Sequence, residues 1–444
     1  MSFDSPIARV VRRVYHLFRI DKLFALKSYC QTGRLVPDVR VRYEVVLSRV
    51  RATFSQRRRI KVLFLISDES KWKMQSLFDA MRQSSRYDPV VAVNLWGWHE
   101  SVVNAEMRAR KAYAFFAARK MTVVYAWDFE SHKPLPLDGM DVDVVFYGQP
   151  WDVHPAHMPD EVSKFALTCY IPYAVQHYEV QNADCALSFH RLLWRHFVTN
   201  ETLAEECRRV RGTMSFAGKV EGIGHTMFDD LNNQLKRHEG EDKQLVVYAP
   251  HWSFTHPNNP NGLNISTFLQ TGLLMLEYAK KHRELKWAYK PHPVLIQALA
   301  KSGVMSQDRI KSYYHDWEQI AECCYDGSYS DLFARSRTLI TDCGSFMTEY
   351  AVTGEPVVWL ISPTATTRPN KASEKLAASY YRVVRSEDLE PVLDDLLVKG
   401  NDPKREARLS AAKAMNLTGT DAAGNIIRHL EELILGEDAG EKEA

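Results

Sequence analysis

No stretch of this 444-residue sequence stays apolar for the roughly 20 residues that a membrane-spanning helix needs, and no apolar segment follows the first basic residues as in a signal peptide. The seven cysteines are odd in number and lack the spacing of metal ligands, which favours reduced thiols and a cytoplasmic location. Hydrophobic residues at 45% and charged residues at 25% are typical of a soluble globular protein rather than a disordered one. The length favours two domains over one compact core.

The net charge of +2 conceals a basic N-terminus. Residues 1–59 hold 14 lysines and arginines against four acidic residues, a local net charge of +10, so the rest of the chain carries about −8. After Ser5 and Pro6, apolar residues recur at helical spacing with arginines between them, which predicts a basic amphipathic helix. Such a helix can lie on the anionic inner face of the cell membrane, or it can pack its apolar stripe on the protein. Nucleic acid is not an expected partner, because no RNA-binding motif accompanies the basic residues.

Beyond this arm, short apolar runs alternate with amphipathic helices. The runs "KVLFLI", "DPVVAVNLW", "MTVVYAW" and "DVDVVFYG" have the continuous apolar character of parallel strands covered on both faces, and the pattern restarts at "KQLVVYAPHW". We therefore predict an α/β protein with two doubly wound, Rossmann-like domains facing a cleft. The predicted boundaries are a basic helical arm at 1–59, a first domain at 60–238, a nucleotide-binding domain at 239–400 and a helical tail at 401–444.

The stretch "TLITDCGSFMTEYAVTGEPVVWL" predicts a strand, a turn that begins at Asp342, a short helix and a second strand. Gly344 allows the backbone to approach a ligand closely, Ser345 adds a hydroxyl, and the start of the helix offers amide groups to an anion. Glu349 lies one helical turn beyond Ser345, where a carboxylate can accept hydrogen bonds from ribose hydroxyls. The alternative is an ordinary helix cap that needs no ligand.

Two further strands end in Pro-His. In "YKPHP" the flanking prolines mount His292 just past a strand, with Lys290 beside it, and in "YAPHWSF" His251 occupies the same position. An imidazole there can accept a proton from an alcohol or, when protonated, hold a phosphate oxygen, and Lys290 supplies permanent charge for a pyrophosphate. The alternative is a solvated turn histidine, but the repetition at two strand ends favours a site.

Together these stretches resemble the C-terminal nucleotide-binding half of the CDP-glycerol glycerophosphotransferase family, enzymes of teichoic-acid and capsule assembly with the GT-B fold. The resemblance covers residues 245–360. It implies that His292, Gly344 and Ser345 bind the CDP pyrophosphate and that Glu349 is the family's acidic helix residue. His251, Lys290 and Asp342 join them as expected donor-binding residues.

The family commonly carries a His-Gly pair in its N-terminal domain, proposed to supply the catalytic base, and this sequence departs from that pattern. The corresponding segment reads "CYIPYAVQHYEV", so His177 within it and His154 in "GQPWDVHPAH" are the candidates beside His292. A metal is not expected. His154 and His157 form a poor zinc site without a third ligand, and the Asp-X-Asp-like pair Asp141 and Asp143 lies within an apparent strand.

The resemblance implies a transferase without a cofactor. An acceptor hydroxyl on a cell-surface glycan or lipid-linked acceptor attacks the β-phosphorus of CDP-glycerol, or of a related CDP-activated polyol phosphate, and CMP leaves. The basic arm then docks a cytoplasmic, peripheral membrane enzyme near its acceptor. Two alternatives stay open: a GT-B glycosyltransferase that uses a nucleotide sugar, and a non-catalytic scaffold of polysaccharide assembly.

Overall fold

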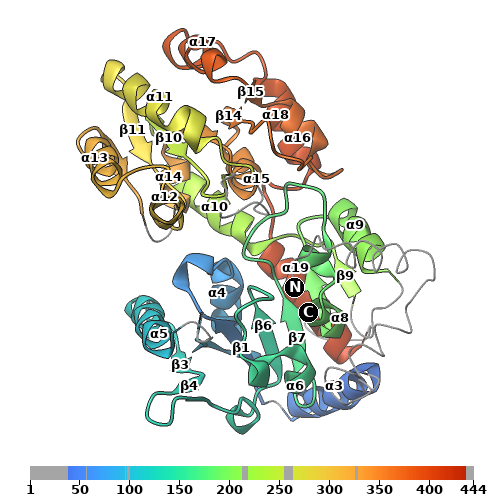
Figure 1. Cartoon of the computed structure of the whole chain (residues 1–444). Coiled ribbons are helices and arrows are strands. Elements are labelled where there is room, and N and C mark those ends of the chain that lie inside the picture. Colours follow the sequence, from blue (N-terminus) through green and yellow to red (C-terminus); the bar gives the residue numbers. More distant parts are fainter. Residues whose placement is uncertain are drawn as a thin grey trace, which may run out of the picture.

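The computed structural model describes residues 39–56, 58–95, 97, 101–212, 219–254, 264–325 and 329–436 (Figure 1). The basic helix predicted over the first residues of the chain lies outside them. The rest of the predicted arm includes helix α3 (Val39–Ser55). In the part of the chain that is described, no helix has the length and apolar character needed to cross a membrane.

The first of two large sheets lies in the N-terminal half and has the strand order β3-β2-β1-β6-β7-β8-β9, with every pair parallel. Its strands are β1 (Ile60–Ile66), β2 (Tyr87–Val93), β3 (Val123–Tyr125), β6 (Val144–Tyr147), β7 (Leu167–Tyr170), β8 (Arg195–Phe197) and β9 (Lys219–Glu221). Successive residues of β1 enter different cores, Phe64 one and Leu65 the other. Both faces are therefore covered, as the continuous apolar runs predict.

Short helices and a small hairpin connect these strands. They are η1 (Glu69–Lys71), α4 (Gln75–Gln83), α5 (Val102–Ala118), β4 (Trp127–Asp128), β5 (Lys133–Pro134), η2 (Asp138–Met140), η3 (Pro155–His157), α6 (Pro159–Val162), α7 (Asn182–Cys185), α8 (Ser188–Leu192) and α9 (Glu201–Arg211). Helix α3 packs its buried stripe, which includes Tyr43, Val46 and Val50, into the same core as β1.

The second large sheet has the order β12-β11-β10-β13-β14-β15 and is also parallel throughout. Its strands are β10 (Leu245–Ala249), β11 (Lys286–Tyr289), β12 (Ala321–Cys323), β13 (Ser336–Thr341), β14 (Val357–Leu360) and β15 (Tyr381–Val383). Its helices are α11 (Phe268–Lys281), α12 (Leu295–Ser302), α13 (Gln307–Glu318), α14 (Ser330–Ala334), α15 (Gly344–Tyr350), η4 (Ala351–Thr353), α16 (Glu374–Ala378), η5 (Ser386–Asp388), α17 (Leu389–Leu393), η6 (Asp394–Val398) and α18 (Arg405–Ala414). The prediction of two doubly wound sheets is confirmed.

Two helices tie the halves together. Helix α10 (Thr226–Arg237) leads from the first sheet to the second, and the last helix, α19 (Ala422–Leu435), returns to the first half (Figure 1). Ile426 and Leu430 of α19 are fully buried in the core around β1. The segment predicted as a tail therefore holds α18, which packs beside the second sheet, and α19, which packs beside the first.

Loops that follow strands of the first sheet meet the second half. Lys73, after β1, donates to Tyr329, and the segment after β7 bonds to residues after β14, with Glu179 N donating to Arg368 O at 2.8 Å. Asn370 N also donates to His177 O at 2.9 Å. The carboxyl ends of the two sheets therefore face each other, which is where open α/β sheets hold their ligands.

Candidate active site

The structure brings three predicted strand ends together. Strands β11, β10 and β13 are neighbours in this order, so the residues after them share one edge of the sheet. The rings of His251 and His292 lie with centroids 5.0 Å apart. Main-chain bonds hold both turns, with Lys290 N donating to Tyr248 O at 2.9 Å and His292 N donating to Pro250 O at 3.0 Å. The two Pro-His turns thus form one cluster with Lys290.

Main-chain contacts also place the proton on each imidazole. His292 Nδ1 accepts from Val294 N at 3.1 Å, and His251 Nδ1 accepts from Ser253 N at 3.2 Å. Burial, followed by the charges of Lys290 and Lys71, lowers the pKa of His292 to about 3, so its ring is neutral at pH 7. A neutral ring whose Nδ1 accepts carries its hydrogen on Nε2. Both histidines can therefore donate an Nε2–H to a phosphate oxygen.

Asp342 is a buried hydrogen-bond acceptor next to this cluster. Its side chain is fully buried, Oδ1 accepts from His251 N at 2.6 Å, and Oδ2 accepts from Thr267 N at 2.6 Å. Burial raises the pKa of Asp342 to about 6, and the hydrogen bonds oppose that rise. In the structure Asp342 therefore fixes the turn that carries His251, and its oxygens point into the protein.

Gly344 begins α15 under an aromatic ring. A Cβ atom on Gly344 would lie 2.4 Å from Cε2 of Tyr178, so only glycine fits there without movement of the ring. Ser345 is half-buried, and its Oγ lies 3.5 Å from Cys343 Sγ. The close approach predicted at Gly344 is therefore made by a side chain of the protein, Tyr178.

Glu349 joins a network that spans the two halves. Its carboxylate accepts from Tyr329 Oη at 2.5 Å, and Lys73 Nζ donates to the same hydroxyl at 2.8 Å. Burial raises the pKa of Glu349 to about 7, against the nearby charge of Lys73. The carboxylate predicted to contact ribose is thus bonded to Tyr329 in this structure.

His177 and His154 lie in different surroundings. The His177 side chain is 2% exposed, its Nδ1 is 2.8 Å from Thr348 Oγ1, and burial lowers its pKa to about 3. His154 is half-buried after β6, where its ring packs on Trp127 of the hairpin and its Nδ1 accepts from Ala156 N. A base must touch the hydroxyl that it deprotonates, and of these two rings the partly exposed one is His154.

A hollow opens beside Tyr178, at the carboxyl end of β14. Its volume is about 420 Å³, and its lining residues include Tyr178, Trp359, Arg368 and Arg382 together with Ser362, Thr366 and Thr367. Ligand sites commonly measure about 300 to 1,000 Å³. The hollow is therefore large enough for a nucleoside, and two arginines lie at its wall.

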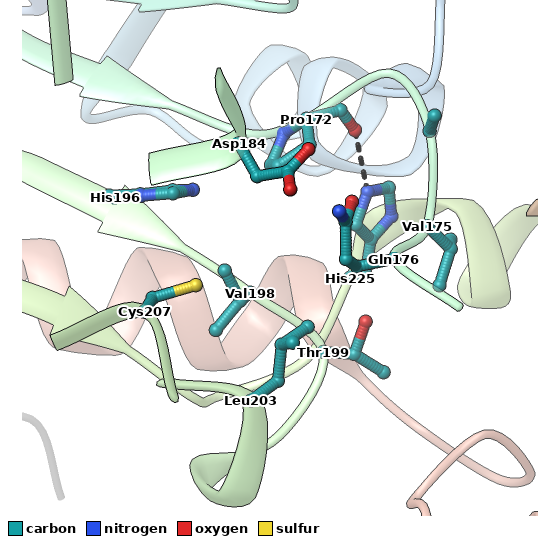
Figure 2. Close-up of a pocket in the computed structure, with 11 residues that line it drawn as sticks. Pro172, Val175, Gln176, Asp184, His196, Val198, Thr199, Leu203, Cys207 and His225 are labelled. Atoms are coloured by element: carbon teal, nitrogen blue, oxygen red, sulfur yellow. Dashed lines mark hydrogen bonds between the residues drawn. The ribbon is translucent and has the colours of Figure 1, made fainter. Parts of the chain in front are cut away.

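A second, much smaller cavity lies within the first half (Figure 2). Its volume is about 20 Å³, and Asp184, His196, Cys207 and His225 are among its lining residues. His225 Nε2 donates to Pro172 O at 2.7 Å, the dashed line in Figure 2. A water molecule needs about 10–15 Å³, so this cavity suits a single water and excludes a nucleotide.

The Asp-X-Asp-like pair lies away from the site. Asp143 precedes β6 at the amino edge of the sheet, where it accepts from Lys61 N at 3.0 Å and pairs with Arg49 at 3.4 Å. Asp141 is exposed and pairs with Arg58. Within the described ranges, the structure contains no group of three or more His, Cys, Asp or Glu residues that could hold a metal ion.

Comparison with solved structures identifies the fold. No protein-family profile and no curated protein matches the chain. The wall teichoic acid polymerase TagF superimposes with a TM-score of 0.55 and 12% identity, over 94% of this chain and 97% of that one. UDP-GlcNAc 2-epimerase from Neisseria meningitidis, bound to UDP-GlcNAc, gives 0.55 and 14% over 84% and 100%. S. aureus MnaA with UDP gives 0.50 and 15% over 85% and 97%.

The chain has the GT-B fold. Several residues at the meeting of the two GT-B halves were missed by the sequence analysis. Lys71 and Lys73 follow β1. Lys71 lies over the ring of Tyr173, Lys73 contacts Tyr329, and Tyr178 packs on Gly344 at the start of α15. The sequence places the two lysines directly after the first strand, and this position was their only indication of a functional role. A turn with charged residues is also common where a loop is simply exposed to solvent. Nothing in the sequence pairs Tyr178 with Gly344.

Proposed function

We propose that the chain is a transferase that moves glycerol phosphate, or a related polyol phosphate, from a CDP-activated donor to a hydroxyl of a cell-surface glycan or lipid-linked acceptor, releasing CMP. The observation that carries the proposal is the cluster of His251, Lys290 and His292 at one sheet edge. The GT-B fold shared with TagF and the resemblance of residues 245–360 to glycerophosphotransferases support it.

In the proposed reaction the acceptor oxygen forms a bond to the β-phosphorus, and the bond from that phosphorus to the bridging oxygen breaks. The electron pair leaves with CMP. The Nε2–H groups of His292 and His251 and the ammonium of Lys290 stabilise the negative charge that develops on the phosphate oxygens. The proton of the acceptor hydroxyl goes to His154, whose ring is neutral because burial lowers its pKa. Since Nδ1 accepts from Ala156 N and the hydrogen therefore lies on Nε2, the nitrogen that takes the proton is Nδ1, and the bond from Ala156 N is released in that step.

The hollow beside β14 is our proposed site for the nucleoside. Tyr178 lies both on Gly344 and at the wall of the hollow, so the nucleoside and the start of α15 would share one aromatic neighbour. Arg368 and Arg382 would then face the ribose or the α-phosphate. Asp342 and Ser345 complete the donor site, Asp342 by holding the His251 turn and Ser345 through its hydroxyl.

We also propose that the basic arm docks the enzyme on the anionic inner leaflet. Helix α3 belongs to the core, so the segment to delete is residues 1–38 rather than 1–59. Flotation with vesicles containing an acidic phospholipid tests the proposal, with neutral vesicles as the control. Unchanged flotation after the deletion would remove the arm from this role.

The reaction itself is tested by its nucleotide product. Incubation with CDP-glycerol and a cell-wall glycan acceptor should release CMP and add glycerol phosphate to the acceptor. A second candidate, sugar transfer, is favoured by the fold likeness to proteins whose structures hold UDP or UDP-GlcNAc. Release of a nucleoside diphosphate from a nucleotide sugar would establish that alternative. No turnover of either donor class would favour the scaffold.

A further inference from the structure

The loop after β1, residues 67–73, carries two lysines toward the second half of the molecule. Asp68 caps the short helix η1 within this loop, accepting from Ser70 N at 2.9 Å. Lys71 Nζ lies 5.7 Å from the centroid of the Tyr173 ring. Lys73 reaches farther and donates from Nζ to Tyr329 Oη at 2.8 Å. The positive charge of Lys73 therefore lies near the edge of the second sheet where the proposed donor site is.

Lys73 and Lys290 share one aromatic neighbour although they come from different sheets. Lys73 Nζ is 4.2 Å from the centroid of the Tyr329 ring, and Lys290 Nζ is 5.7 Å from the same centroid. Lys290 Nζ is also 5.9 Å from the ring centroid of Phe346 on α15. Two ammonium groups, one from each half, thus gather beside the helix that follows the predicted phosphate turn.

Two positive charges meet at this place. Burial lowers the pKa of Lys73, the nearby Glu349 and Asp230 oppose that change, and the charge of Lys290 adds to it. The two ammonium groups therefore repel each other, while Glu349 attracts both. A diphosphate between the lysines would offset their repulsion, because each phosphate brings negative charge into a partly desolvated place.

We propose that the loop after β1 forms the side of the donor site that belongs to the first half of the molecule. Lys73 of this loop, held by Tyr329 and Glu349, binds the diphosphate of a nucleoside diphosphate ester together with Lys290 and His292. This inference rests on the proposed function and assigns residues to its donor site. Lys71 adds charge that reaches His292. Because Lys73 belongs to the first half, diphosphate binding requires contact between the halves.

The test is calorimetric binding of inorganic pyrophosphate, CDP and CMP to the full chain and to three variants. Lys73→Met should weaken CDP and pyrophosphate by about tenfold or more and CMP by a smaller factor, since one charge-assisted contact to the diphosphate is lost. Its CDP affinity should also depend less on NaCl between about 50 and 300 mM. Tyr329→Phe keeps the ring but removes the hydroxyl that positions Lys73, so an intermediate loss is expected.

The matched control is Lys164→Met. Lys164 is exposed, pairs with Glu161 and precedes β7 at the opposite edge of the sheet, so this variant should bind like the parent. Parent-like CDP binding by Lys73→Met would overturn the inference while leaving the proposed function standing. Equal weakening of CDP and CMP with an unchanged salt dependence would also overturn it, because that is the result of a purely structural lysine. A parent protein that binds no probe would overturn the proposed function and this inference with it.

Discussion

At the scale of single residues, His292 illustrates how a main-chain bond selects between two chemistries. The sequence predicted an imidazole at a strand end, able to act either as a base or as a phosphate ligand. The structure adds that Nδ1 accepts from Val294 N and that burial keeps the ring neutral, so Nε2–H is a donor. The choice depends on folded burial and on the turn that follows, neither of which the pattern of prolines reveals.

Glu349 gives a prediction for stability against pH. Burial raises its pKa from 4.5 to about 7, so the unfolded chain releases this proton at a lower pH than the folded chain does. The contribution of this group to the free energy of unfolding therefore falls by up to about 3 kcal/mol as the pH rises from about 4.5 to 7. Above pH 7 this contribution no longer changes. Glu349→Gln should flatten this part of the profile.

Urea unfolding of parent and Glu349→Gln at about pH 5 to pH 8 measures the effect, since the difference between the two profiles isolates one carboxyl. Asp342, whose pKa is raised to about 6 by burial, contributes a fall in both proteins and cancels. Parallel profiles for parent and variant would contradict the raised pKa of Glu349.

His154 gives a prediction for catalysis. If it takes the acceptor proton, His154→Ala should lower kcat by about 10²- to 10⁴-fold and leave the affinity for CDP unchanged. His177→Ala is the comparison, because His177 is buried against Thr348 and its loss should lower stability more than kcat per folded enzyme. An unchanged kcat in His154→Ala would require a different base.

At the scale of elements, the sequence predicted the strands but not the side chain that packs on the turn after β13. The ends of β10, β11 and β13 carry the three stretches singled out in the sequence, because continuous apolar runs mark buried parallel strands and polar turns mark their ends. Gly344 was interpreted as a place for ligand approach. The ring that fills this space belongs to Tyr178 of the first half. The spacing of residues in the sequence cannot predict a contact between two halves of the molecule.

Gly344 and Tyr178 therefore make a coupled pair. Gly344→Ala should cost about 1 to 3 kcal/mol of unfolding free energy, because the new methyl group would overlap the Tyr178 ring. In a Tyr178→Ala background the same change should cost clearly less, since the ring is gone. Chemical denaturation of the two single variants and the double variant measures the coupling. Additive losses would contradict the packing of Tyr178 on the start of α15.

At the scale of the whole molecule, two doubly wound halves follow from the repeated strand and helix pattern, whereas the way they meet does not. The bond from Lys73 to Tyr329 and the return of α19 to the first half join residues far apart in the sequence. The apolar positions of α19 predict a helix with a buried face, but they do not show which core buries that face. The sequence therefore predicted a helical tail without predicting that α19 packs on the first half.

The return of α19 is anchored by one carboxylate on α10. Asp229 accepts from Ala422 N at 2.9 Å through Oδ1 and from Ala423 N at 2.8 Å through Oδ2. Asp229→Ala should lower the unfolding free energy by about 1 to 2 kcal/mol and speed hydrogen exchange in α19, as loss of a helix cap does. Glu432→Ala, an exposed change on the same helix, should leave both values near those of the parent. Parent-like exchange in Asp229→Ala would contradict the anchor.

The central claim is that the cluster of His251, Lys290 and His292 binds a CDP-activated donor. Calorimetry of CDP-glycerol, CDP-ribitol, CDP, CMP, UDP and GDP with the parent and with His292→Ala tests it most directly. We predict that the cytidine diphosphate compounds bind best and that His292→Ala weakens them about tenfold, through loss of the Nε2–H donor. Preference for UDP or GDP, or the absence of nucleotide binding by the parent, would contradict the claim.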